Sequence, residues 1–79
     1  MSNIELYNQV FRDSFNVEES QLAGLTYQSV TQWDSVGHMA MIASLEETFD
    51  IMMEIDDIID LSSYEKGKEI LAQKYDISF

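Results

Sequence analysis

The chain has 79 residues, no cysteine, and 15 acidic against four basic side chains, which gives a formal net charge of -11. A chain of this length forms a single domain, residues 1–79, and must hold its core together without disulfides or thiolate metal sites. The negative charge argues against nucleic acid and anionic membranes as partners and favours proteins with basic surfaces. Hydrophobic residues make up 46% of the chain, which is too many for a disordered acidic tail.

The location of the protein is predicted from two missing signals. No apolar run approaches the roughly 18 residues that a membrane-spanning helix requires. The first residues also lack the basic and apolar blocks of a secretory signal peptide. We therefore expect a cytoplasmic monomer that binds neither membranes nor nucleic acid.

The first predicted helix begins directly after Ser2. Residues 2–5 fit a capping box, in which the Ser2 hydroxyl accepts from the first turn while Glu5 accepts from the Ser2 N–H. Apolar residues keep helical spacing to Phe15, and Asn16, which tolerates a left-handed backbone, is expected to end the helix. The periodicity then fades as far as Trp33, which predicts a long ordered loop. Three apolar residues are expected to pin this loop to the core: Val17, Leu22 and Leu25.

The second predicted helix begins at Asp34, a good N-cap residue, and runs to about Phe49. At 100° per residue, one apolar face of this helix is expected to point into the core. The residues of that face are His38, Met41, Ile42, Leu45 and Phe49. The face beside Ser35 mixes apolar and acidic residues and is expected to be free for a partner. Its residues are Val36, Met39, Ala43, Glu46 and Glu47.

The remainder of the chain predicts two further helices. Residues 55–61 are too few for a helix that is stable alone, so we expect a short helix held in place by burial of Ile58 and Ile59. A second capping-box match begins at Ser62 and opens a last helix to about Tyr75, which Gly67 is expected to weaken. The predicted fold is all-α: a small bundle of three main helices plus a short helix in third position, with a long loop between the first and second helices.

Catalysis and metal binding are not favoured by the residues available. An unassisted serine is a weak nucleophile, and the one histidine, His38, falls on the predicted core face, where it is expected to pack rather than to act as a base. There is no G-x-S-x-G elbow, so we reject a small hydrolase and expect a protein that is not an enzyme. Asp56, Asp57 and Asp60 lack the spacing of a calcium loop, so we interpret them as a solvated acidic face and expect no metal.

Ser35 is nevertheless suited to carry a phosphate. It lies in the first turn of the predicted second helix, where unpaired N–H groups and the positive end of the helix dipole favour negative charge. The alternative is that Asp34 and Ser35 are only a polar cap pair. The position of the two residues does not by itself separate these interpretations.

The sequence around Ser35 resembles a known family. Asp34-Ser35-Val36 is similar to the Asp-Ser-Leu signature of acyl carrier proteins, in which the serine carries a 4′-phosphopantetheine arm. Residues 45–50, Leu-Glu-Glu-Thr-Phe-Asp, resemble the family's Leu-Glu-Glu-x-Phe segment, and the length, acidity and helix order agree over nearly the whole chain. The resemblance implies that Ser35 is the attachment residue, that Asp34 is its motif partner, and that the exposed face of the second helix is the recognition surface.

The same resemblance implies a function, a cofactor and partners. The function is to hold acyl or aminoacyl groups as thioesters, the cofactor is 4′-phosphopantetheine from coenzyme A, and the partners are a phosphopantetheinyl transferase and loading and transferring enzymes with basic docking patches. Val36 in place of leucine, the less acidic Gly37 and Ala40, and Trp33 before the motif favour a specialised pathway, such as polyketide, nonribosomal peptide or surface-glycan assembly, over housekeeping fatty-acid synthesis. The alternative is an acidic helical adaptor that binds a basic protein and has no prosthetic group.

Overall fold

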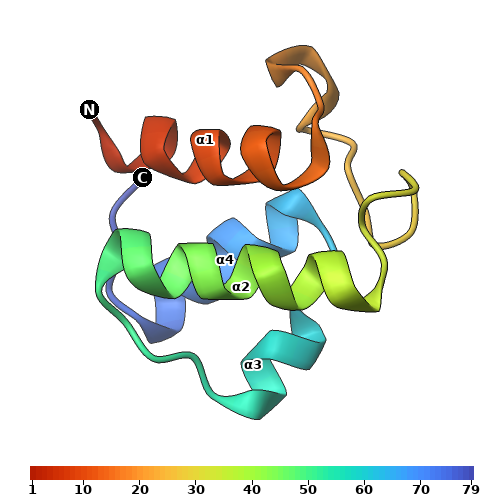
Figure 1. The fold of residues 1–79 in the computed structure, drawn as a ribbon. Helices are drawn as coiled ribbons and strands as arrows, with labels where there is room; N and C mark the ends of the chain where they lie inside the picture. The colour runs from red at the N-terminus through yellow and green to blue at the C-terminus, as the bar shows by residue number, and fades with distance from the viewer.

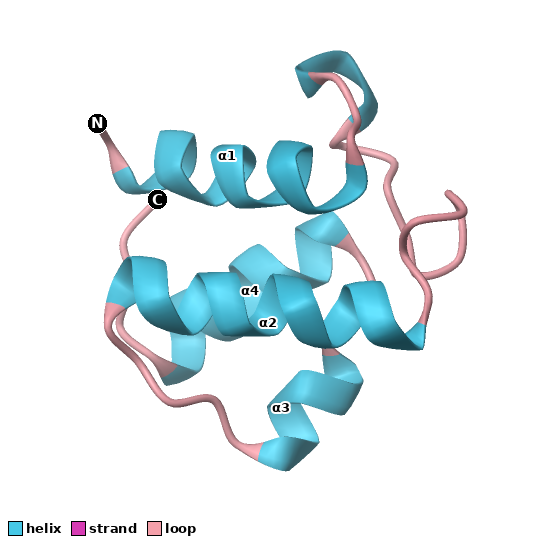
Figure 2. Cartoon of the chain, viewed as in Figure 1, coloured by secondary structure: helices cyan, strands magenta, loops and turns pink.

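A computed structural model describes all of residues 1–79, and its regular elements are all helices joined by loops (Figure 1). The elements are α1 (Asn3–Phe15), the 3₁₀ turn η1 (Glu19–Gln21), α2 (Ser35–Phe49), α3 (Ile55–Asp60) and α4 (Tyr64–Lys74). No strand is formed (Figure 2), and the one isolated bridge joins Thr26 to Ser63. The prediction of a small all-α bundle with a short third helix is confirmed.

The three longer helices enclose the core. α1 and α2 lie side by side, α4 passes behind α2, and the short α3 lies below α2 (Figure 1). The core is closed by side chains from all three long helices and from the long loop. Its fully buried members include Tyr7, Phe11, Phe15, Trp33, Met41, Leu45 and Leu71.

The ends of α1 and the following loop agree with the local sequence signals. The Ser2 hydroxyl accepts from the Glu5 N–H at 3.3 Å, and the Glu5 carboxylate accepts from the Ser2 N–H at 3.4 Å, which completes the predicted capping box. Asn16 has a left-handed backbone with φ of 53° and ends the helix. The loop then contains η1, which was not predicted. The three predicted anchors are all buried: Val17, Leu22 and Leu25.

The start of α4 is one residue later than predicted. The N-cap residue is Ser63, whose hydroxyl accepts from the backbone N–H three residues further on at 3.0 Å. The predicted box between Ser62 and Glu65 is therefore wrong. The reason is a long-range contact, because the Ser62 carbonyl accepts from the Tyr27 N–H and the backbone is still extended at Ser63.

Gly67 has a packing role inside α4. The Tyr7 hydroxyl donates a hydrogen bond of 2.8 Å to the Tyr64 carbonyl, and a Cβ atom at position 67 would lie 2.1 Å from the Tyr7 oxygen. Burial raises the pKa of the Tyr7 phenol well above its usual value, so the phenol remains a neutral donor. Glycine has a low intrinsic helix propensity. At position 67, however, its missing side chain allows α1 to approach α4.

Candidate functional site

The start of α2 presents a serine to solvent. Asp34 is the N-cap residue; its carboxylate accepts from the Gly37 N–H at 2.8 Å, and its carbonyl accepts from the His38 N–H. Ser35 is the first residue of the helix and is exposed. Because the first N–H groups of a helix have no intrahelical acceptor, the Ser35 hydroxyl lies where the helix attracts negative charge.

The loop before α2 passes very close to its first turn. A Cβ atom on Gly37 would lie 1.9 Å from the Gln32 carbonyl oxygen, so only glycine fits at this position. The absence of a side chain at position 37 lets the loop pack closely against the helix just before Ser35. Close packing therefore explains the glycine at position 37, and this explanation does not depend on which partners the protein binds.

Tyr27 brings a second hydroxyl group to Ser35. The Tyr27 hydroxyl oxygen lies 3.1 Å from Ser35 Oγ. The Tyr27 ring packs edge-on against the Trp33 and His38 rings, with centroid distances of 6.5 and 5.8 Å. Tyr27 was not among the predicted site residues, because it lies in a loop without periodicity and nothing in the local sequence relates it to Ser35.

Trp33 and His38 form a polar link below the serine. Trp33 is fully buried and stacks on Phe15 at 4.7 Å between ring centroids. The Trp33 Nε1–H donates to His38 Nδ1 at 2.9 Å, so Nδ1 is an acceptor and the ring proton is on Nε2, 2.7 Å from the Ile58 carbonyl oxygen. Both ring nitrogens are therefore engaged. His38 lies on the inner side of α2 as predicted, but it is half-buried and held by one hydrogen bond to Trp33 in the preceding loop and one to Ile58 in α3.

A cavity of about 350 Å³ lies beside Ser35, between α2 and α3. Its lining is mostly apolar and consists of Tyr27, Ser35, His38, Met39, Ile58, Ile59, Leu61 and Ser62. The prediction that Ile58 and Ile59 are both buried is wrong for Ile59, which is 70% exposed, whereas Ile58 is half-buried. Successive side chains of a helix point in directions that differ by about 100°. Because α3 packs on one side only, the residue that follows Ile58 points toward solvent.

α3 is anchored to the end of α4 by a buried carboxylate. Asp57 is 4% exposed and accepts two hydrogen bonds of 2.7 Å, from Lys74 Nζ and from the Tyr75 hydroxyl. Asp56 and Asp60 are exposed, as predicted, but the interpretation of Asp57 as solvated is wrong. The Lys74 hydrogen bond, and after it that of Tyr75, holds the pKa of the Asp57 carboxyl below its usual range.

Asp57→Asn is expected to make the free energy of unfolding depend less on pH in the acid range. The folded-state pKa of Asp57 lies below the unfolded value, so this contact contributes stability above about pH 4 and loses it as the pH falls through the folded-state pKa. Urea unfolding followed by circular dichroism should show a variant that is weaker at neutral pH and changes less below about pH 4 than wild type. Asp56→Asn, at an exposed position, is the control. Parallel pH profiles for wild type and Asp57→Asn would contradict this role.

The exposed apolar surface continues from α2 onto α3. Val36 and Met39, both predicted to contact a partner, are 79% and 53% exposed near the start of α2. Ile55 and Ile59 are 75% and 70% exposed on α3, and Ile59 lines the same cavity as Met39. Ala43 is also exposed, further along α2. Met39 and Ile59 thus form one exposed apolar patch across α2 and α3, and such patches are typical of protein-binding surfaces.

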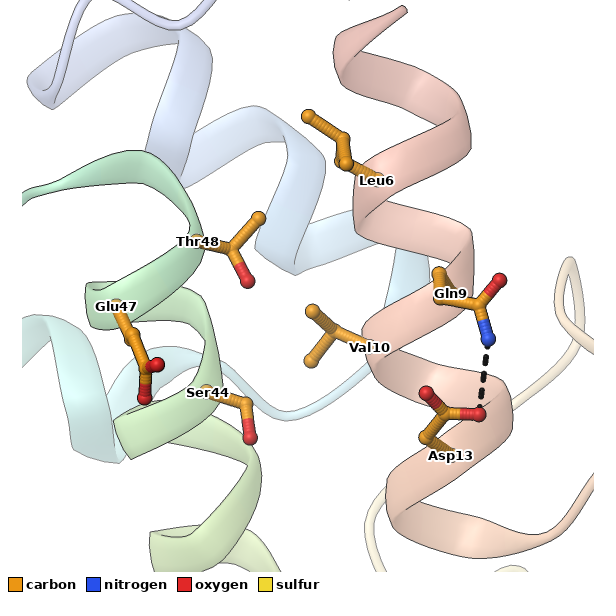
Figure 3. A pocket seen from close by; sticks show the side chains of 7 residues that line it. All are labelled: Leu6, Gln9, Val10, Asp13, Ser44, Glu47 and Thr48. Atoms are coloured by element: carbon orange, nitrogen blue, oxygen red, sulfur yellow. Dashed lines mark hydrogen bonds between the residues drawn. The ribbon is translucent and has the colours of Figure 1, made fainter. Parts of the chain in front are cut away.

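The two predicted glutamates lie on different sides of α2. Glu46 is half-buried, and its carboxylate accepts from the Met53 N–H at 2.9 Å, so it supports the turn that leads to α3. Glu47 is exposed and lines a groove of about 470 Å³ between α1 and α2, shown in Figure 3. The other residues of this groove are Leu6, Gln9, Val10, Asp13, Ser44 and Thr48. Glu46 and Glu47 therefore do not form one charged cluster.

Comparisons of the chain with models of protein families, with curated protein sequences and with solved structures found no match. None of the helices combines the length and the hydrophobicity needed to cross a membrane. Fold and site together define a small acidic helical protein with an exposed serine at the first turn of α2, next to an apolar cavity.

Proposed function

We propose that the protein is a carrier that tethers acyl or aminoacyl groups on a 4′-phosphopantetheine arm attached to Ser35 and delivers them to partner enzymes in a specialised cytoplasmic pathway. The observation that carries this proposal is the exposed Ser35 hydroxyl in the first turn of α2, next to the Tyr27 hydroxyl and the apolar cavity. The resemblance of residues 34–36 and 45–50 to acyl carrier proteins supports it. When attached, the arm supplies a thiol that holds its cargo as a thioester, in a chain that has no cysteine.

The surroundings of Ser35 suit a phosphodiester. The unpaired N–H groups of the first turn and the helix dipole favour an anion there, and the exposed side chain can be extended without disturbing the core. His38 has both ring nitrogens engaged, by Trp33 and by the Ile58 carbonyl. The proton of the Ser35 hydroxyl is therefore removed by a base of the partner transferase, and the carrier itself contributes a positioned hydroxyl.

The surface of the protein suits short encounters with several enzymes. A net charge of -11 steers the protein toward basic patches and gives fast, salt-dependent association. The exposed apolar residues near Ser35 and on α3 would then form the contact core of each encounter. Holding cargo on a tether gives it a high effective concentration at each docked enzyme.

Intact mass spectrometry after incubation with coenzyme A and a phosphopantetheinyl transferase tests the proposal. A carrier gains the mass of one phosphopantetheine group. An acidic adaptor without a prosthetic group has the same charge and helices, but gives no reason for the serine at this position and gains no mass. A hydrolase would instead turn over activated esters without coenzyme A. Failure to gain mass, with a transferase that modifies a known carrier in the same tube, would reject the proposal.

Reversing Glu46 and Glu47 to lysine is expected to slow modification several-fold at low salt and to weaken its salt dependence. Glu47→Lys alone should slow modification without changing stability, because the side chain is exposed. Glu46→Lys should also lower stability by about 1 kcal/mol, because it removes the acceptor of the Met53 N–H. Glu69→Lys on α4 makes the same charge change as each single variant and is their control for net charge. If the double variant is modified as fast as wild type at low salt, docking uses another surface.

A further inference from the structure

We propose that Tyr27 is a positioning residue for the phosphodiester on Ser35, and that its hydroxyl donates a hydrogen bond to the phosphate once the arm is attached. The inference rests on the proposed attachment at Ser35. It starts from the 3.1 Å contact between the Tyr27 hydroxyl and Ser35 Oγ in the unmodified protein.

The Tyr27 side chain is held in place from several directions. Its backbone N–H donates to the Ser62 carbonyl at 2.8 Å, and the next N–H, of Gln28, donates to the Trp33 carbonyl at 2.9 Å. Its ring lies edge-on to the Trp33 and His38 rings. A phenol fixed by its backbone and its ring has little rotamer freedom to lose when its hydroxyl binds a ligand.

Modification of Ser35 places stronger hydrogen-bond acceptors near the Tyr27 hydroxyl. A bond forms between Ser35 Oγ and the phosphorus of coenzyme A that bears the pantetheine, the bond from that phosphorus to the bridging oxygen of the pyrophosphate breaks, and adenosine 3′,5′-bisphosphate leaves. The hydroxyl proton of Ser35 passes to the transferase base. Ser35 Oγ is then a weak ester acceptor, whereas the non-bridging oxygens share a negative charge and are strong acceptors two bonds away.

Tyr27 is the side-chain donor that already contacts Ser35 Oγ. None of the four basic side chains, Arg12, Lys66, Lys68 and Lys74, lines the cavity beside Ser35. The His38 ring proton is directed at the Ile58 carbonyl. Once Ser35 Oγ is esterified it has no proton to donate, so the Tyr27 hydroxyl is the donor, and its hydrogen bond to a charged phosphate oxygen is stronger than one to a neutral oxygen. The phosphate is thereby held at the mouth of the cavity.

A thermodynamic cycle of four proteins tests the role of Tyr27: wild type and Tyr27→Phe, each unmodified and fully modified. Tyr27→Phe keeps the ring and removes only the hydroxyl. Urea unfolding should show that modification stabilises wild type more than the variant, by a factor of roughly five in the unfolding equilibrium constant. The ³¹P chemical shift of the phosphodiester should also differ between the two modified proteins.

Tyr7→Phe is the matched control. It also removes one phenolic hydroxyl, but that hydroxyl donates to the Tyr64 carbonyl and does not contact Ser35. It should weaken the unmodified and modified proteins equally and leave the ³¹P shift unchanged. A coupling factor of one and an unchanged ³¹P shift for Tyr27→Phe would overturn the role of Tyr27 while leaving attachment at Ser35 in place. A wild-type chain that accepts no phosphopantetheine would instead reject the proposed function.

Discussion

Ser35→Ala is expected to fold like wild type and to accept no phosphopantetheine. The Ser35 side chain is exposed, and its one hydrogen bond is to the partly exposed Tyr27 hydroxyl, so its removal should cost no more than about 1 kcal/mol. Loss of modification should be complete, because no other group replaces the hydroxyl. Thermal unfolding and intact mass after incubation with coenzyme A and a transferase measure both effects on one sample.

Ser63→Ala provides the reciprocal control. Ser63 caps α4 by accepting from the Lys66 N–H, so its loss should lower the free energy of unfolding by about 1 kcal/mol. Modification at Ser35 should be unaffected in this variant. A Ser35→Ala protein that still gains one phosphopantetheine would mean that another residue carries the arm.

An eight-carbon acyl group on the arm is expected to raise the melting temperature by several degrees above that of the unloaded arm. The cavity of about 350 Å³ next to Ser35 has an apolar lining, and each buried methylene contributes about 0.8 kcal/mol. For a domain of this size, 1 kcal/mol shifts the melting temperature by roughly 4–8 °C. An acetyl or aminoacyl group is too short or too polar to gain from burial and should leave the melting temperature unchanged.

A variant of the cavity wall tests whether the eight-carbon acyl group lies in this cavity. Ile59→Ser changes an exposed residue, so it should alter the unloaded protein little and reduce the gain from the eight-carbon group. Amide shifts around Ile58 should accompany loading in wild type. Identical melting temperatures for the eight-carbon and unloaded forms would show that the bundle does not enclose its cargo, and would favour a carrier of polar groups.

Features set by neighbouring residues were predictable from the sequence. The capping box at Ser2, the left-handed end at Asn16 and the N-cap at Asp34 each depend on side chains within three or four positions, and all three are present. Of the five residues of α2 predicted to face the core, three are buried, Met41, Ile42 and Leu45, and two are half-buried, His38 and Phe49. The exposed position of Ser35 follows from the same short-range rules.

Features set by contacts between distant residues were not predictable. Asp57 is buried because Lys74 and Tyr75, 17 and 18 residues away, supply its hydrogen bonds. Ser62 does not cap α4 because its carbonyl accepts a hydrogen bond from the backbone N–H of Tyr27. For the same reason Tyr27 could not be assigned to the candidate site, since only the folded loop brings its hydroxyl to Ser35. Local patterns thus predicted the elements, and tertiary contacts decided which polar side chains serve the site.

Attachment of the arm to Ser35 is tested most directly by peptide mass spectrometry of the protein isolated from its own cells. We expect a peptide that contains Ser35 with one phosphopantetheine group, and a cargo on its thiol in part of the sample. The attached group would also identify the pathway. A Ser35 peptide that is unmodified as isolated, and still unmodified after incubation with coenzyme A and a transferase active on a known carrier, would show that Ser35 does not carry the arm.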